Sequence, residues 1–145
     1  MWIKGGRLID PANNRDELAD ILIRDGRIEG IYPTAGTVPQ GEEVIDAQGM
    51  WVLPGLIDMH AHVREPGFEY KEDIESAGRA AAAGGVTTVV CMANTDPVND
   101  NPSVTQYIIR KAARVSRVRI LPVGAITVGL EGKVLAEMGL MREAG

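Results

Sequence analysis

The sequence predicts an α/β protein in which a small β domain precedes the first part of a (β/α)8 barrel. Residues 1–53 alternate short apolar runs with turn residues, a rhythm typical of small β domains. From residue 54 onward, apolar strand patterns alternate with amphipathic helix patterns, which indicates a parallel sheet built from βα units. The only two histidines of the chain follow the first strand of this second part, at the strand end where barrels carry their chemistry.

Residues 1–53 are predicted to form a small β-sandwich-type domain of short strands. The strand patterns cover residues 2–9, 19–24, 27–32, 43–46 and 50–53. Asp25-Gly26 separates the second pattern from the third and is a strong signal for a hairpin with a two-residue turn. Regular spacing of strands and turns favours a small antiparallel sheet or a half-sandwich.

Residues 54–145 are predicted to form three βα units. The first strand resumes after Pro54-Gly55 and is expected to continue to Arg64. The later strands are expected at residues 86–92 and 117–123, and the helices at 73–83, from Asn101-Pro102 onward, and at 131–142. The second helix has its apolar side chains at helical spacing, namely Val104, Ile108, Ala112 and Val115.

Such units can close into a barrel or remain an open, doubly wound sheet. The loop after the first strand carries histidines and an arginine in place of a glycine-rich phosphate-binding turn, which favours the barrel. A closed barrel of this type needs about 250 residues. We therefore expect the chain to be the truncated first part of a longer barrel protein.

The composition argues against several classes of protein. The formal net charge is −5 and aromatic residues make up 4% of the chain, which disfavours a nucleic-acid or anionic-membrane surface. No segment reaches the roughly 18 apolar residues of a membrane span. The single cysteine, Cys91, lies in an apolar run and is expected to be a small buried side chain. A reducing, cytoplasmic setting is expected, without nucleic-acid or membrane partners.

The two histidines stand one residue apart, and a continuous strand would alternate the side chains around them between its two faces. One face would then carry Asp58, His60, His62 and Arg64, and the other Ile57, Met59, Ala61 and Val63. Residues two apart on a strand are separated by roughly 6.6 Å, so His60 and His62 can converge on one metal ion. Neutral imidazoles suit zinc, but two ligands are too few, and at least one more must come from elsewhere.

Three polar residues nearby are candidates for roles around such a metal. Asp58 can orient a ligating histidine through its other ring nitrogen, or it can bind backbone amides instead. The planar guanidinium of Arg64 fits a substrate carboxylate through two parallel hydrogen bonds. Asn94 follows the second strand of the parallel sheet, where it can recognise a carboxylate or an amide, or serve as a turn residue.

At these residues the sequence resembles a known family. The stretch Pro54-Gly-Leu-Ile-Asp-Met-His-Ala-His62 is similar to the first barrel strand of the amidohydrolase superfamily. The continuation resembles the dihydroorotase family in four segments, which are His62-Val-Arg-Glu-Pro-Gly67, Tyr70-Lys-Glu72, residues 80–88 and Met92-Ala-Asn-Thr95. The two histidines mark only the superfamily, whereas Arg64-Glu65-Pro66-Gly67 and Asn94-Thr95 narrow the resemblance to dihydroorotase.

The resemblance implies roles for individual residues. His60 and His62 would bind the more buried zinc of a site with one or two zinc ions, and Arg64 and Asn94 would hold the carboxylate of dihydroorotate. Ala93 stands where the family has proline, a departure expected to loosen this loop. The remaining metal ligands and the general-base aspartate of the family come from later strands and are absent from this sequence. The 145-residue chain is therefore expected to hold no catalytic residue of its own and to be inactive alone.

The activity implied is the reversible hydrolysis of a cyclic amide, (S)-dihydroorotate, to N-carbamoyl-L-aspartate, a step of pyrimidine (UMP) biosynthesis. One alternative is another cyclic amidohydrolase, an allantoinase or hydantoinase. A second alternative is a non-catalytic, dihydroorotase-like scaffold for aspartate transcarbamoylase. Besides the small-molecule substrate, the resemblance thus allows a homodimer and aspartate transcarbamoylase as partners.

Overall fold

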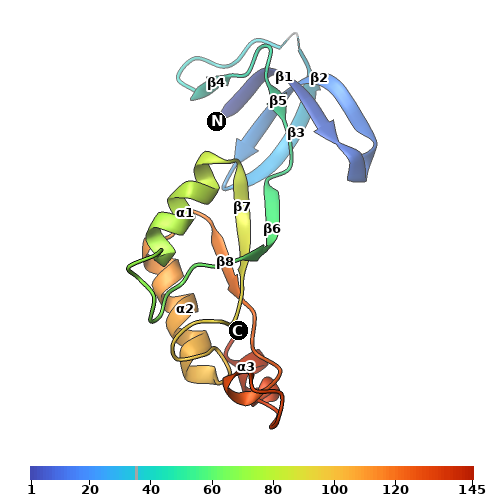
Figure 1. The fold of residues 1–145 in the computed structure, drawn as a ribbon. Coiled ribbons are helices and arrows are strands. Elements are labelled where there is room, and N and C mark those ends of the chain that lie inside the picture. The colour runs from blue at the N-terminus through green and yellow to red at the C-terminus, as the bar shows by residue number, and fades with distance from the viewer. Residues whose placement is uncertain (35) are drawn as a thin grey trace. The chain divides into compact units, whose positions relative to one another are not determined.

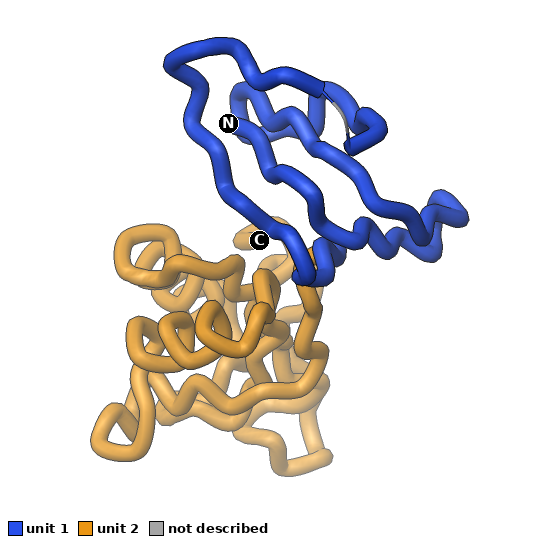
Figure 2. The backbone as a smooth tube through the Cα atoms, turned by 90° about the horizontal axis from the view of Figure 1, so that it is seen from above, with its two compact units in different colours: residues 1–54 blue, residues 55–145 orange. Residues whose placement is uncertain are grey.

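The computed structural model describes residues 1–34 and 36–145. Two compact units make up the chain, unit 1 at residues 1–54 and unit 2 at residues 55–145 (Figure 2). Figure 1 labels the strands and helices along the chain.

Unit 1 is one mixed sheet of five strands. Its strands are β1 (Trp2–Asp10), β2 (Arg15–Arg24), β3 (Arg27–Pro33), β4 (Val44–Asp46) and β5 (Trp51–Val52), and a short 3-10 helix, Pro11–Asn13, joins the first two. The order is β3-β2-β1-β4, with β5 also paired to β1. β1, β2 and β3 pair antiparallel as predicted, but β4 and β5 run parallel to β1. The described residues of unit 1 thus form a single mixed sheet, so the expected antiparallel pairing holds for β1, β2 and β3 but not for β4 and β5, and no second sheet makes a sandwich of these residues.

The tight turn that the sequence predicts in unit 1 is present in the structure. Asp25 and Gly26 both have positive φ, 50° and 70°, as a tight turn between β2 and β3 requires. A small core forms around Leu8, Ala19 and Ile21.

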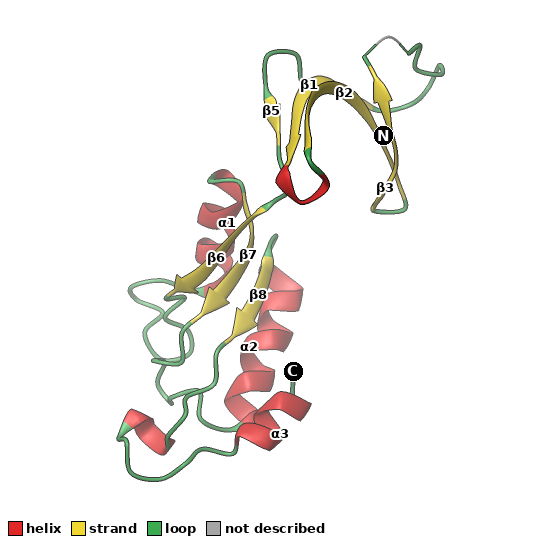
Figure 3. Cartoon of the chain, turned by 90° about the vertical axis from the view of Figure 1, so that its right-hand side faces the viewer, coloured by secondary structure: helices red, strands yellow, loops and turns green. Residues whose placement is uncertain are grey.

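Unit 2 contains a parallel sheet with the order β6-β7-β8, which confirms the predicted parallel pairing. The strands are β6 (Leu56–Ala61), β7 (Val86–Cys91) and β8 (Arg119–Pro122). Helices α1 (Ile74–Ala83) and α2 (Pro102–Val115) connect them and lie on one side of the sheet (Figure 3). Strand, helix and strand thus follow one another as they do in a barrel, and closure into eight units remains a prediction.

Both helices begin after residues whose side chains cap them through hydrogen bonds. The Asn101 side chain accepts hydrogen bonds from the N–H groups of Ser103 and Val104, at 3.0 and 3.2 Å, and Pro102 occupies the first turn. Asp73 accepts from the Ser76 N–H at 2.7 Å in the same way. These caps satisfy N–H groups that have no partner within the helix, so the helix starts are determined locally.

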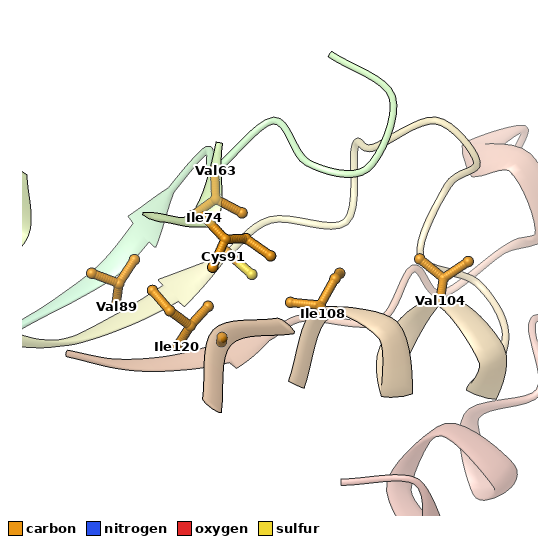
Figure 4. Close-up of a cluster of buried hydrophobic side chains, with 8 residues drawn as sticks. Val63, Ile74, Val89, Cys91, Val104, Ile108 and Ile120 are labelled. Atoms are coloured by element: carbon orange, nitrogen blue, oxygen red, sulfur yellow. The ribbon is translucent and has the colours of Figure 1, made fainter. Parts of the chain in front are cut away.

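The core of unit 2 lies between the sheet and the helices (Figure 4). Its buried members come from both strands and helices and from the loop after β6, and they are Val63, Ile74, Val89, Cys91, Val104, Ile108, Ala112 and Ile120. Burial raises the pKa of the Cys91 thiol to about 11, so this side chain is a neutral core residue at physiological pH.

The predicted third helix is largely wrong. Only α3 (Met138–Glu143) is helical within residues 131–142, and it is preceded by a 3-10 turn, η2 (Val128–Leu130). Gly132 has a φ of +72°, which interrupts any helix there. The segment folds back on itself instead, because Ala136 donates to the Ile126 carbonyl at 2.9 Å and Val128 donates to the Val134 carbonyl at 2.9 Å.

The other side of the sheet in unit 2 has apolar side chains in contact with solvent. Ile57 and Met59 of β6 are 63% and 74% exposed. Within residues 1–34 and 36–145, every helix is too short or too polar to cross a membrane.

A buried carboxylate joins the loop after β6 to both helices. Glu65 is 1% exposed and its two oxygens are fully engaged. Its Oε2 accepts from the Ile74 N–H at 3.0 Å, at the start of α1. Its Oε1 accepts from the Tyr107 hydroxyl and pairs with the Lys111 ammonium, both at 2.6 Å and both from α2. A buried charge is tolerated only with such partners, so these contacts are required together.

This cluster gives the stability of the chain a specific dependence on acid. Burial alone would raise the pKa of Glu65, but hydrogen bonds from Lys111, Tyr107 and Ile74 outweigh it and hold the pKa below its ordinary 4.5. The carboxylate therefore contributes stability above pH 4.5, and this contribution is lost as the pH falls through the lower pKa of the folded state.

We expect Glu65→Gln to reduce the free energy of unfolding at neutral pH and to flatten its fall between about pH 5 and pH 2. Urea unfolding followed by circular dichroism at a series of pH values measures both. Glu75→Gln is the matched control, since Glu75 is 53% exposed and pairs only with Arg79 on the surface of α1. Parallel pH curves for wild type and Glu65→Gln would contradict the assignment.

Candidate functional site

The carboxyl ends of β6 and β7 meet at one edge of the sheet in unit 2. β6 ends at Ala61 and β7 at Cys91, and the Met92 N–H donates to the Ala61 carbonyl at 2.9 Å just past the pairing. Parallel sheets bind ligands at this edge. His62, Arg64 and Asn94 all lie in the two loops that leave it, and His60 stands next to the last residue of β6.

A bulge in β6 changes which face each side chain occupies. Asp58 pairs with Val89 and Ala61 pairs with Cys91, so three steps on β6 match two steps on β7. Val89 and Cys91 are both in the core, and side chains of paired residues lie on the same face. Asp58 and Ala61 therefore both face the helices. The predicted strict alternation is therefore interrupted between Asp58 and Ala61.

Beyond the bulge the two imidazoles come together. His62 lies between Ala61, which packs against the core, and Val63, which is 1% exposed in the core. The rings of His60 and His62 are exposed, with centroids 5.4 Å apart and planes at 71°. The structure thus brings the two predicted metal ligands side by side at the edge of the sheet.

The ring of His62 is oriented by Asn94 from the loop after β7. Its Nδ1 lies 2.8 Å from Asn94 Oδ1. Because this amide oxygen can only accept, Nδ1 carries the proton and Nε2 keeps its lone pair for a ligand. The amide nitrogen of Asn94 makes no hydrogen bond with the described residues and is left over as a donor.

Asp58 takes the alternative that binds backbone. Its Oδ1 accepts from the His60 N–H at 2.9 Å, so it holds the main chain of His60. Asp58 and His62 both line a hollow of about 220 Å³ beside α1, together with Ala77 and Ala81.

The loop that carries Asn94 is anchored by a buried asparagine. Asn99 is 1% exposed, and its N–H donates to the Ala93 carbonyl at 3.0 Å. Its amide group donates to the Val123 carbonyl at 2.9 Å and accepts from the Thr105 hydroxyl at 2.7 Å. Ala93 itself is 6% exposed, and the loosening expected from the missing proline remains a prediction.

Arg64 sits at the centre of a strained three-residue turn. The Glu65 N–H donates to the Val63 carbonyl at 2.7 Å, and Arg64 between them has a φ of +62°. A γ-turn of this hand is rare, and a non-glycine residue in such a conformation costs about 1–3 kcal/mol. β6 therefore ends three residues before Arg64, where the sequence predicted a continuous strand.

Arg64 as a residue is half-buried, and its guanidinium has no hydrogen bond or ion pair with the residues that the structure describes. Only its backbone is engaged, since its carbonyl accepts from the Phe68 N–H at 2.9 Å. The loop is also tied to its neighbour, because the Asp96 N–H donates to the Pro66 carbonyl at 3.0 Å. A Cβ on Gly67 would overlap the Asp96 carbonyl oxygen, so the two loops need glycine there.

The donor set fits part of a zinc site. Among residues 1–34 and 36–145, no three His, Cys, Asp or Glu side chains gather closely enough to hold a metal ion. His60 and His62 thus offer two neutral imidazoles, one with its tautomer set for binding, and the other positions of the site stay open.

Two residues of this edge escaped the sequence analysis as individual sites. Glu65 and Asn99 are polar residues in predicted loops, where exposure is the ordinary expectation. For Glu65 the one signal was its place inside the Arg-Glu-Pro-Gly motif, and for Asn99 the sequence carries none.

Comparison with known proteins now adds to this geometry. A family model described as "Dihydro-orotase-like" matches residues 49–145. A protein named dihydroorotase from Syntrophotalea carbinolica is 57% identical over 143 residues, which cover 99% of this chain and 33% of that protein. Another dihydroorotase, from Syntrophus aciditrophicus, is 51% identical with 99% and 34% coverage. The chain spans about a third of the length of these relatives.

Solved structures resemble the chain at lower identity. An L-hydantoinase (dihydropyrimidinase) from Arthrobacter aurescens matches with a TM-score of 0.83 and 27% identity, over 99% of this chain and 31% of that one. A D-hydantoinase (dihydropyrimidinase) from a Thermus species matches with a TM-score of 0.71 and 31% identity, over 98% and 30%. The family model and the relatives of 48–57% identity agree with the resemblance carried by the sequence motifs. The chain belongs to the dihydro-orotase-like family.

Proposed function

We propose that a protein carrying this chain at the length of its relatives is a cytoplasmic, zinc-dependent dihydroorotase. It would interconvert (S)-dihydroorotate and N-carbamoyl-L-aspartate in pyrimidine biosynthesis. One observation carries the proposal. Arg64 follows His62 by two residues, in a loop that leaves the edge where two imidazoles meet, and its guanidinium has no partner among the residues that the structure describes.

A guanidinium without a partner among the described residues, two positions after a candidate metal ligand, favours an anionic substrate. Arginine binds carboxylates through two parallel N–H donors, and such charge-assisted bonds are the strongest polar contacts a site can offer. Asn94 adds a free amide donor nearby, because its oxygen is occupied by His62. Dihydroorotate carries a carboxylate on its ring, so Arg64 and Asn94 would hold that group and orient the cyclic amide.

His60 and His62 would supply two ligands of the site for one or two zinc ions. When bound, zinc polarises an amide carbonyl and makes water a competent nucleophile near neutral pH. This chain's own contribution is orientation: Asn94 sets the tautomer of His62, and Asp58 holds the main chain of His60. The remaining ligands and the general-base aspartate would lie outside these 145 residues, so the chain alone would not catalyse the reaction.

A hydantoinase or allantoinase is the second candidate. The structural similarity to hydantoinases favours it, with TM-scores of 0.83 and 0.71. The substrates of those enzymes have no carboxylate for Arg64 to bind. A scaffold for aspartate transcarbamoylase, or a homodimer without activity, is less consistent with two imidazoles that remain paired and oriented.

The substrate assay with an Arg64 variant tests the proposal. A protein of the relatives' length carrying this chain is expected to hydrolyse dihydroorotate and to leave hydantoin and allantoin intact. Arg64→Ala should raise KM for dihydroorotate about 10- to 100-fold, the equivalent of about 1.5–3 kcal/mol from lost charge-assisted hydrogen bonds. Zinc content should stay normal. Steady-state kinetics and metal analysis provide both readouts.

Arg79→Ala is the matched control, because Arg79 lies on the exposed surface of α1 and pairs with Glu75. Its kinetics should equal those of the wild type. Turnover of hydantoin without turnover of dihydroorotate would decide for the second candidate, and unchanged kinetics in Arg64→Ala would remove Arg64 from the site.

Zinc affinity should depend on the imidazoles and on their orientation. His62→Ala should abolish tight zinc binding, while Asn94→Leu should weaken it about tenfold because the partner that sets the His62 tautomer is lost. Asp58→Asn keeps an oxygen for the His60 N–H and should bind zinc normally. Competition titration with a chromogenic chelator measures all three affinities. Equal affinity in Asn94→Leu and wild type would show that this contact does not support the metal.

A further inference from the structure

We infer that Glu65 is a positioning residue, which Tyr107 and Lys111 hold in place so that Arg64 stays free and aimed at the substrate carboxylate. This inference rests on the proposed function, since it concerns how the carboxylate is bound. None of the three residues needs to touch the substrate.

The backbone around Arg64 is held at both ends of its strained turn. Val63 on one side is 1% exposed in the apolar core, and Glu65 on the other side is 1% exposed in its polar cluster. A positive φ at arginine persists only where the surroundings impose it. If the Glu65 anchor is lost, the turn can relax to negative φ, which re-aims the Cα–Cβ bond of Arg64 and moves its guanidinium.

The cluster also keeps a neighbouring carboxylate away from the guanidinium. Glu65 follows Arg64 directly in the chain and would be an obvious internal partner for it. Instead, Tyr107 and Lys111 occupy its Oε1 and the Ile74 N–H occupies its Oε2. The Lys111 ammonium at 2.6 Å balances the charge of Glu65. Among the described residues, the Arg64 guanidinium therefore has no carboxylate partner and keeps its charge for a ligand.

Both donors come from the exposed side of α2, which makes the arrangement testable without damage to the core. Tyr107 is 41% exposed as a whole residue. The side chain of Lys111 is 39% exposed. Tyr107→Phe deletes one hydroxyl and Lys111→Met deletes one charge. The apolar core beneath them, which includes Ile108 and Ala112, is unchanged in both variants.

The experiment measures KM, kcat and zinc content in a protein of the relatives' length that carries this chain. Tyr107→Phe and Lys111→Met should each raise KM for dihydroorotate about tenfold, because displacement of a binding group by a fraction of an ångström to 1 Å weakens its contacts. kcat and zinc content should change little. Lys133→Met is the matched control, since Lys133 is 75% exposed and pairs only with Glu131.

A double-mutant cycle separates positioning from a general structural role. If the cluster acts through Arg64, Tyr107→Phe should have no further effect on KM once Arg64 is replaced by alanine. Crystal structures of the single variants should show the Arg64 φ leaving its positive value, or Glu65 turned to pair with Arg64. Additive effects of Tyr107→Phe and Arg64→Ala on KM would overturn the inference. So would an Arg64 turn and a KM that are both unchanged in the two single variants.

Failure of the inference is distinguishable from failure of the proposed function. If Arg64→Ala raises KM but the two α2 variants do not, the carboxylate is bound by Arg64 and the positioning role alone is overturned. If Arg64→Ala itself leaves KM unchanged, both are overturned. Glu65→Gln, which removes the charge at the centre of the cluster, should give the largest rise in KM of the variants in this cluster.

Discussion

The parallel pairing of β6 with β7, with one extra residue in β6, is the constraint on which the site depends. Pairing places both carboxyl ends at one edge, and the bulge keeps Ala61, like Asp58, on the helix side of the sheet. A strand without the extra residue would place Ala61 and Asp58 on opposite faces. The position of the histidine pair at this edge of the sheet therefore depends on the pairing of β6 with β7.

Polar side chains, more than apolar packing, determine the shape of the two loops at this edge. Glu65 ties the first loop to both helices, and Asn99 ties the second loop to the end of β8. Each is buried and hydrogen-bonded through its polar atoms, which is the condition under which burial of such groups is tolerated. Rigid loops of this kind can hold Arg64 and Asn94 at defined positions without a ligand present.

The proteins similar to this chain form two groups, which differ in how much of its sequence they share. Hydantoinases share the fold at 27–31% identity, whereas dihydroorotases share about half of the residues. A common scaffold with different loops is the usual way in which one fold serves several substrates. In this chain the loops after β6 and β7 carry the groups suited to a carboxylate, and the strands beneath them carry the shared architecture.

The sequence by itself determined the features that depend on near neighbours along the chain. The turn at Asp25-Gly26, the helix start at Asn101 and the parallel strand Val86–Cys91 follow from residues within a few positions of each other. The pairing of His60 with His62 belongs to the same class, because two residues on one strand end cannot be far apart.

Only the tertiary structure decided the features that depend on contacts between distant segments. The bulge in β6 is visible only against β7, and the fold-back of residues 131–137 arises from bonds to residues 126–128 that no helical periodicity reveals. The turn at Arg64 needs Glu65 to be buried against α1 and α2, up to 46 residues further along the chain in the case of Lys111. A local sequence pattern can identify Arg64 as a candidate binding residue. The position of its guanidinium depends on how α1 and α2 pack around Glu65.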